Sequence, residues 1–286
     1  MNDYNTLSDI EAICELLNYS ESQFASELGI SRTSINNWRL NKNEISDTAL
    51  ENIYNFAFSK NIRLNKIKEQ LYKEDYENDH TVVLFHGAKN NIVDNLSIDK
   101  SKDDNDFGKG FYCGESLEQS AMFVSGYKQS SIYIAKFDMK NLNSYKFKVD
   151  RDWMLTIAYF RNKINEYKNH EIIQSLISKL NNIDYVIAPI ADNKMFQIID
   201  DFINGEITDV QCQHCLSATN LGNQYVFITE KALKNVELIS HCYLAPLEKE
   251  YYLQSRIDES RIGNDKVKLA KREYRGQGLY IDQLLK

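Results

Sequence analysis

The spacing of apolar residues changes near His80, and this change limits the fold more than any other feature of the sequence. Before it, residues such as Ile10, Ile13 and Leu17 recur at the spacing of one helix face. After it, helical stretches are mixed with short β-branched runs, among them TVVLFHG, SSIYIAKFDM and IDYVIAPIAD. We therefore predict a helical segment followed by a region that contains both helices and strands.

The strands and helices after His80 follow no regular βαβ repeat. This favours an α+β architecture with a largely antiparallel sheet over a doubly wound fold. We expect a small all-α helical domain over residues 1–60, a helical linker over 61–79, the α+β domain over 80–245 and a charged C-terminal extension over 246–286.

The C-terminal extension carries a basic run made of Lys266, Lys268, Lys271, Arg272 and Arg275. A solvated helix is the usual structure of such a run. Two alternatives are that the run guides an anionic acceptor, such as a nucleic acid, or that it docks a partner.

Composition and charge limit the partners and the cellular compartment that we expect for this chain. With a net charge of −7 over 286 residues, no global field attracts polyanions. The sequence lacks an apolar run long enough to span a membrane, and MNDYNTLSDIEAI lacks the basic and apolar regions of a secretion signal. Its 5 cysteines fit reduced thiols. We expect a cytoplasmic protein with no membrane partner.

The segment from Gln23 to Trp38 has the pattern of two short helices separated by Gly29. We expect Ser22 to cap the first helix and Ser31 to cap the second. The inward-facing residues would then be Phe24, Ala25, Leu28, Ile35 and Trp38.

In this pattern the segment resembles the Xre/Cro-type helix-turn-helix. The resemblance implies DNA as a partner, contacted by exposed side chains that suit base edges and phosphates: Arg32, Thr33, Ser34, Asn36, Asn37 and Arg39. Acidic residues are at least as numerous here as basic ones. A small helical bundle used for dimerisation or for docking a protein therefore stays an alternative.

Three separated pieces of the α+β region form a second pattern. They are LFHGA at 84–88, GKGFYCGESLEQSAMF at 108–123 and NQYVFIT at 223–229. In order and spacing they resemble the diphtheria-toxin-like branch of ADP-ribosyltransferases, which includes the poly(ADP-ribose) polymerases. They are most similar to an uncharacterised bacterial group, whose patterns also match Asp106–Tyr112, Asp184–Asp192 and Gln224–Leu233.

The resemblance implies an ADP-ribosyltransferase-like split β-sandwich that takes NAD as its substrate. Its catalytic residues would be His86, Tyr112 and Gln224. By the resemblance, His86 would bind a ribose hydroxyl, while Gly87 and Ser120 would bind the carboxamide. Tyr112 and Phe123 would stack on the nicotinamide ring.

Gln224 departs from the family pattern, because the polymer-forming enzymes carry a catalytic Glu at this position. An amide can bind the ribose 2′-hydroxyl, but it cannot act as a general base. Chain elongation is therefore not expected, whereas single transfer to an already nucleophilic acceptor is. Glu115, Asp192 and Glu230 are candidates for a substitute carboxylate.

A metal site is not expected. Cys212, His214 and Cys215 precede the adjacent pair His241 and Cys242, but the second ligand pair of a zinc knuckle is missing.

The sequence thus predicts an NAD-dependent mono-ADP-ribosyltransferase that modifies a protein or nucleic acid and releases nicotinamide. A bacterial toxin, in a toxin–antitoxin or phage-defence system, is the setting that the resemblance implies, with an antitoxin or inhibitor protein as a further partner. One alternative is a helix-turn-helix DNA-binding regulator with a non-catalytic NAD-sensing domain. Another is a structural or interaction module that binds no NAD.

Overall fold

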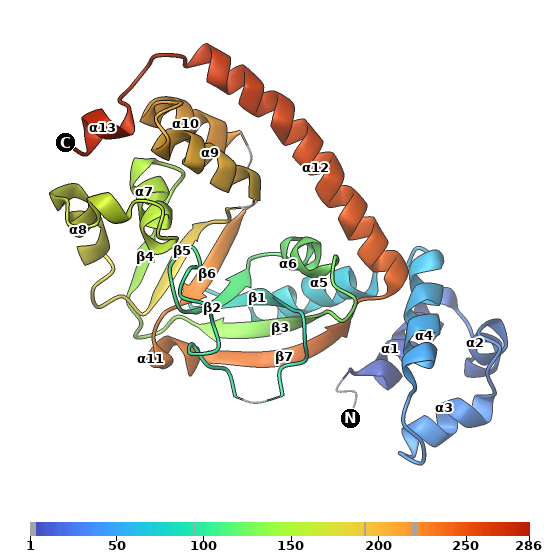
Figure 1. Ribbon diagram of the computed structural model, residues 1–286. Helices are drawn as coiled ribbons and strands as arrows, with labels where there is room; N and C mark the ends of the chain where they lie inside the picture. Colours follow the sequence, from blue (N-terminus) through green and yellow to red (C-terminus); the bar gives the residue numbers. More distant parts are fainter. Residues whose placement is uncertain (1–3, 94, 192, 219–221) are drawn as a thin grey trace. The chain divides into compact units, whose positions relative to one another are not determined.

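The computed structural model describes residues 4–93, 95–191, 193–218 and 222–286 (Figure 1). The chain forms two compact units, each assembled from three separate segments. The first unit contains residues 1–91, 116–137 and 237–255, and the second contains 92–115, 138–236 and 256–286. Both units mix distant parts of the sequence, so each is described by itself.

Among the residues that the structure describes, the first unit contains the helices of the N-terminal half and three strands. Its elements are α1 (Thr6–Leu17), α2 (Glu21–Glu27), α3 (Arg32–Arg39), α4 (Asp47–Ser59), α5 (Leu64–Tyr76), β1 (Thr81–Ala88), α6 (Leu117–Val124), β3 (Ser131–Asp138) and β7 (Val236–Tyr243). The strands lie in the order β1-β3-β7. The long helix α12 (Pro246–Glu273) is divided between the units.

Helices α1 to α4 form within the predicted helical domain and α5 within the predicted helical linker, and all five share one core. Ile10, Phe24 and Ile35 are fully buried in it. Gly29 has a φ of +66° in the turn between α2 and α3, which an L side chain adopts only with strain. Ser31 caps α3 as expected. The predicted order of two short helices around Gly29 is confirmed.

The cap of α2 differs from the prediction. Ser20, not Ser22, accepts the hydrogen bond from the backbone N–H of Gln23. The side chain of Gln23 in turn accepts from the backbone N–H of Ser20, at 2.8 Å. This reciprocal capping box satisfies two orphan donors at once, which a cap at Ser22 would not do.

A buried polar network joins the N-terminal helices to α5. Lys68 of α5 donates to the Asp9 carboxylate of α1 at 2.7 Å. The hydroxyl of Tyr54 in α4 donates to the same carboxylate at 2.5 Å. Each polar group in this contact therefore has a partner of opposite charge or a hydrogen bond, which a buried charge requires.

In the described part of the second unit there are four strands and the remaining helices. Its elements are β2 (Phe111–Gly114), β4 (Ser144–Lys146), α7 (Arg151–Phe160), the 3-10 turn η1 (Asn165–Tyr167), α8 (Glu171–Ser178), β5 (Tyr185–Pro189), α9 (Asn193–Ile203), α10 (Asp209–Ser217), β6 (Asn223–Phe227), α11 (Glu230–Leu233) and α13 (Ile281–Leu284). The strands lie in the order β4-β5-β6-β2. Strand β6 is antiparallel to both β5 and β2, whereas β4 and β5 are parallel.

The core of the second unit includes residues from the end of the chain. Val267, Ala270, Ile281 and Leu285 are buried in it beside Trp153 of α7. The backbone of Leu279 also exchanges hydrogen bonds with Asp209, since Leu279 N–H donates to Oδ1 at 2.8 Å and Leu279 C=O accepts from Asp209 N–H at 2.9 Å. The last residues are therefore part of this unit, although α12 keeps exposed basic side chains.

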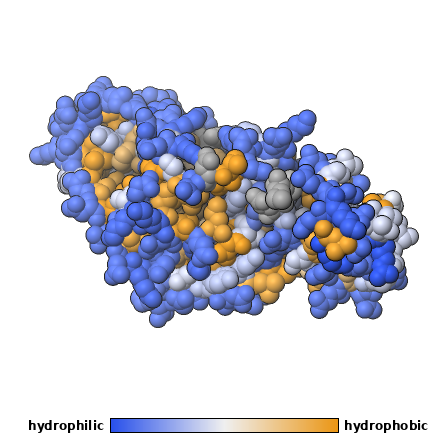
Figure 2. Space-filling model, turned by 90° about the horizontal axis from the view of Figure 1, so that it is seen from below, coloured by the Kyte–Doolittle hydropathy of each residue, from blue (hydrophilic) through white to orange (hydrophobic). Residues whose placement is uncertain are grey.

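The expected α+β class is confirmed in its coarse form, a helical N-terminal region followed by mixed helices and strands. No described helix has both the length and the apolar character needed to cross a membrane. Figure 2 shows apolar residues that reach the surface of one face among hydrophilic ones.

Candidate functional site

In the first unit, the end of β1 is held against α6. The hydroxyl of Ser120 donates to the carbonyl oxygen of Phe85 at 2.8 Å, and Phe85 and Ser120 are both buried. A Cβ atom added to Gly87 would lie 2.7 Å from the backbone oxygen of Ser120 and 2.8 Å from Cγ1 of Val124. Strand and helix are thus too close for any side chain at Gly87.

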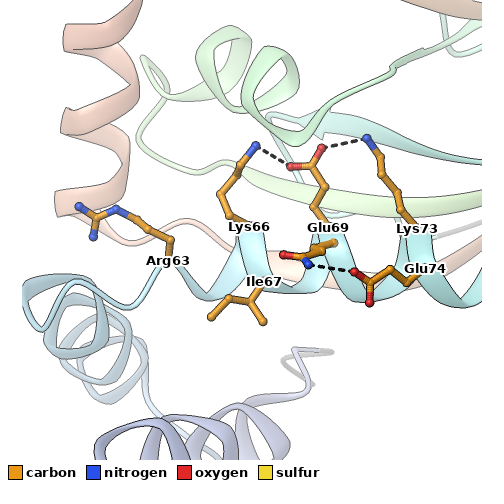
Figure 3. A pocket seen from close by; sticks show the side chains of 7 residues that line it. Arg63, Lys66, Ile67, Glu69, Lys73 and Glu74 are labelled. Atoms are coloured by element: carbon orange, nitrogen blue, oxygen red, sulfur yellow. Dashed lines mark hydrogen bonds and ion pairs between the residues drawn. The ribbon is translucent and has the colours of Figure 1, made fainter.

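The start of α6 is fixed by two kinds of hydrogen bond. Ser116 and Gln119 form a capping box. The carboxylate of Glu69, from α5, accepts from the backbone N–H of Leu117 at 3.2 Å. Figure 3 shows this carboxylate between Lys66 and Lys73, which lie 2.7 Å and 3.2 Å from its oxygens. Helix α5 therefore positions the helix that carries Ser120 and Phe123.

Four residues of the sequence-predicted NAD site lie on β1 and α6. His86 is half-buried near the end of β1, next to Gly87. Ser120 is 7% exposed, whereas Phe123 is 63% exposed. With its only proton donated to Phe85, the Ser120 hydroxyl can accept a hydrogen bond from a ligand but has no further proton to donate.

In the second unit, Tyr112 closes the loop that precedes β2. Its hydroxyl donates to the carbonyl oxygen of Gly108 at 2.8 Å and accepts from the backbone N–H of Phe107 at 3.1 Å. Burial raises the pKa of Tyr112, so the phenol stays protonated at neutral pH. A Cβ atom on Gly110 would lie 2.9 Å from Cγ1 of Val226, which explains the second glycine of the motif.

Tyr112 and Gln224, far apart in the sequence, lie on the same face of neighbouring strands. Tyr112 pairs with Val226 and Gly114 pairs with Gln224 in the β2–β6 register. Residues two apart on a strand share a face, so Tyr112 and Gln224 do as well. On its other side Gln224 pairs with Ala188 of β5. Its two strand partners, Gly114 and Ala188, are therefore both small residues.

The amide of Gln224 is bound by Asp106, a residue that the sequence interpretation did not include in the site. Gln224 Nε2 donates to Asp106 Oδ2 at 3.0 Å and to the carbonyl oxygen of Pro189 at 3.3 Å. Asp106 is 6% exposed, and Gln224 is 7% exposed. Asp106 could have been found from the sequence, because it begins the matched segment Asp106–Tyr112.

Arg161 provides the charge that balances Asp106. Its Nε and Nη2 atoms each lie 2.9 Å from Asp106 Oδ1. The guanidinium carbon is 3.4 Å from the centre of the Phe196 ring, a cation–π contact. Burial raises the pKa of Asp106, while Arg161 and Gln224 oppose that rise. The sequence offered no signal for Arg161, because it lies in no motif.

Of the substitute carboxylates, Glu115 is engaged within the sheet. It accepts from the backbone N–H and the side-chain Nδ2 of Asn223, both at 3.0 Å. Glu230 is exposed in the first turn of α11. Asp192 lies outside the described residues. The carboxylate that contacts Gln224 is Asp106 instead.

The residues predicted to contact DNA lie on α3. Arg32 and Asn36 are exposed, and Asn37 is half-buried. The hydroxyls of Ser34 and Ser31 are 3.0 Å apart at the start of the helix. Arg39 forms ion pairs with Glu21 and, at 3.4 Å, with Glu11. Its charge is thereby neutralised by acidic residues of α1 and α2.

The comparisons with known proteins identify one family. Residues 82–238 match the model of "Protein of unknown function (DUF3990)", which covers more than half of the chain. The chain belongs to the DUF3990 family. No curated protein and no solved structure matches it.

The DUF3990 match spans the residues that the resemblance assigns to NAD. It begins in β1 and ends in β7, and so includes His86, Tyr112 and Gln224 as well as the newly found Asp106 and Arg161. Helices α1 to α5 precede it.

Cys212 and Cys215, for which no metal role is expected, are buried. Their Sγ atoms lie 3.6 Å and 3.7 Å from the backbone oxygens of Ile198 and Val267.

Proposed function

We propose that this DUF3990 protein is an NAD-dependent mono-ADP-ribosyltransferase with the split β-sandwich fold of that superfamily. The observation that carries the proposal is that Tyr112 and Gln224, from two separate motifs, occupy one face of β2 and β6. Motifs that matched by chance would have no reason to place these two residues on one face of neighbouring strands. The mixed strands and helices described above support the finer fold assignment.

The proposed reaction breaks the bond between the nicotinamide nitrogen and C1′ of the ribose. The electron pair leaves with nicotinamide, and an acceptor nucleophile forms the new bond to C1′ and releases its proton. An oxocarbenium-like state needs a fixed leaving group and stabilisation of positive charge. In the proposal, the backbone of Gly87 and the lone pairs of Ser120 hold the carboxamide, and His86 holds a ribose hydroxyl.

Gln224 restricts the acceptor. Its amide takes up no proton, so a neutral alcohol on the acceptor would not be deprotonated by this residue. The proposed acceptor is a protein or nucleic acid whose nucleophile is reactive without a general base, and one ADP-ribose is added. A toxin or phage-defence role, with an inhibitor protein as partner, is the proposed context.

The proposal is tested with the purified full chain, NAD labelled in its adenylate phosphate, and a bacterial lysate as the source of acceptors. We expect free nicotinamide and a labelled macromolecule, and we expect both to be lost in His86→Ala and Tyr112→Ala. The matched control is His80→Ala, because His80 is exposed just before β1.

Other outcomes identify the alternatives. Nicotinamide released without a labelled acceptor would indicate hydrolysis of NAD. Binding of NAD without turnover, together with a changed affinity for duplex DNA, would favour the NAD-sensing regulator, for which the exposed Arg32 and Asn36 of α3 are the supporting observation. No binding at millimolar NAD would contradict both proposals.

A further inference from the structure

We infer that Asp106 and Arg161 are positioning residues that turn the Gln224 amide so that its oxygen faces the substrate. The inference rests on the proposed function, because it names the atom that Gln224 would offer to the ribose. Gln224 then acts as a hydrogen-bond acceptor for a ribose hydroxyl, while its NH₂ group donates to Asp106 and Pro189 of the protein.

The neighbours of Gln224 decide which way the amide points. Its nitrogen lies 3.0 Å from Asp106 Oδ2 and 3.3 Å from the carbonyl oxygen of Pro189. The oxygen and nitrogen of an amide are normally assigned from their hydrogen-bond partners. An ionised carboxylate and a carbonyl both accept only, so two acceptors require the NH₂ group on their side. The reversed amide would place three oxygens together in a buried site.

Arg161 favours the charged state of Asp106, which this arrangement requires. Both contacting nitrogens of Arg161 lie at Oδ1, which leaves Oδ2 to Gln224. The side chain of Arg161 is itself held over Phe196. If Asp106 became protonated, it would gain a donor and would no longer require the NH₂ group of Gln224 on its side. The orientation therefore depends on a charged Asp106.

The geometry also explains why a glutamate is disfavoured at position 224. A carboxylate there would face the carboxylate of Asp106 and the carbonyl of Pro189 in a buried site, where like charges repel strongly. The same change becomes acceptable if Asp106 is replaced by asparagine, because the asparagine NH₂ group can donate to the new carboxylate. The two positions should therefore behave as a coupled pair.

The test compares Gln224→Glu, Asp106→Asn and the double variant. We expect Asp106→Asn to raise KM for NAD by about tenfold with a smaller change in kcat, as for one lost hydrogen bond to a charged group. We expect Gln224→Glu to lower both the melting temperature and kcat/KM, and the double variant to regain much of each. Asp103→Asn is the matched control, since Asp103 lies in the same loop and its side chain is 81% exposed.

A pH profile separates positioning from a general structural role. Wild-type kcat/KM should fall toward acid as Asp106 is protonated, and Asp106→Asn should lack that limb. An Asp106→Asn variant that matches Asp103→Asn in KM and pH profile would overturn the inference, while the proposed transferase would stand. If the wild type cleaves no NAD, the proposed function fails. The melting temperatures of the two single variants and the double variant then still test the coupling of Asp106 and Gln224. Additive shifts overturn the coupling, and non-additive shifts support it.

Discussion

The carboxylate of Glu69 accepts a hydrogen bond from the backbone N–H of Leu117 at 3.2 Å, and this contact joins α5 to the start of α6. Glu69 is buried on one side and contacts Lys66 and Lys73 on the other. Together with the Asp9–Lys68 contact, it makes α5 the element that connects the N-terminal helices to the helix of Ser120 and Phe123. A segment with the charge pattern of a linker is thus part of the packed unit.

We expect Glu69→Ala to lower the free energy of unfolding by about 1–3 kcal/mol, because it leaves the Leu117 N–H and two lysines without their partner. Glu69→Gln should cost less, since its oxygen still accepts from Leu117. Denaturant titrations of both variants measure this difference. Glu74→Ala is the control on the exposed side of α5, and an equal loss there would contradict the prediction.

Stability should fall as the pH rises from about 4.5 toward 7, because of Glu248. Burial raises the pKa of Glu248 from 4.5 to about 7, although Asn65 opposes the rise. The folded state therefore binds a proton over this range that the unfolded state has lost, and stability is greatest at the acid end. The expected decrease is roughly 3 kcal/mol.

Glu248→Gln should remove this pH dependence and stabilise the protein at pH values of about 8. Asn65 Nδ2 donates to Glu248 Oε2 at 2.9 Å, while Asn65 Oδ1 is buried and has no hydrogen-bond partner among the described residues. A glutamine would keep the first bond and its NH₂ group could supply the second. Thermal unfolding of both proteins across the pH range checks this, and parallel curves would count against it.

Gly87→Ala should destabilise the first unit by about 1–3 kcal/mol, because the new methyl group would overlap the backbone oxygen of Ser120. We also expect weaker binding of NAD, seen as a smaller rise in melting temperature on adding NAD. Gly126→Ala is the control, since a Cβ atom there would meet Leu253 only at an ordinary 3.9 Å. A tolerated Gly87→Ala would show that β1 and α6 can separate without cost.

Phe123→Ala should change stability by less than about 0.5 kcal/mol, because the side chain is 63% exposed. If Phe123 stacks on nicotinamide, the variant should nevertheless weaken NAD binding by about fivefold to tenfold, the effect of one aromatic contact. Calorimetric titration with NAD measures this. Leu71→Ala, at another exposed apolar position, should bind NAD like the wild type, and equal binding by Phe123→Ala would exclude the stacking role.

The sequence predicted the features that depend on residues close together in the chain. Apolar spacing located α1 to α3 and the strands β1, β3 and β5, and turn chemistry located Gly29 and the Ser31 cap. The cap at Ser20 was missed because two serines two residues apart offer the same local signal, and only the Gln23 side chain distinguishes them.

The contacts that were missed join residues from distant segments. Asp106, Arg161 and Gln224 lie in three separate parts of the sequence, and their meeting depends on how β6 and α7 pack. Arg161 also follows α7, where a terminal arginine usually interacts with the helix carbonyls or with water. No periodicity or spacing could relate such residues, whereas Tyr112 and Gln224 could be proposed because each belongs to a motif.

The charge around α3 leads to a prediction about DNA. Arg39 is paired with Glu21 and Glu11, so these acids compete with a phosphate for its positive charge. We expect weak binding of the wild type to a random duplex. Replacing both acids, in Glu11→Gln/Glu21→Gln, should strengthen binding and steepen the dependence of log Kd on log salt concentration by about one unit, since one more cation contacts the backbone.

Fluorescence anisotropy with a labelled duplex at several salt concentrations measures both quantities. The matched control is Glu15→Gln, which removes one exposed acid of α1 that has no ion pair among those described. If the control changes the salt dependence as much as the double variant does, net charge and not Arg39 governs binding. Tight, sequence-specific binding by the wild type would instead contradict the prediction, and it would favour a regulator that reads DNA through Arg32 and Asn36.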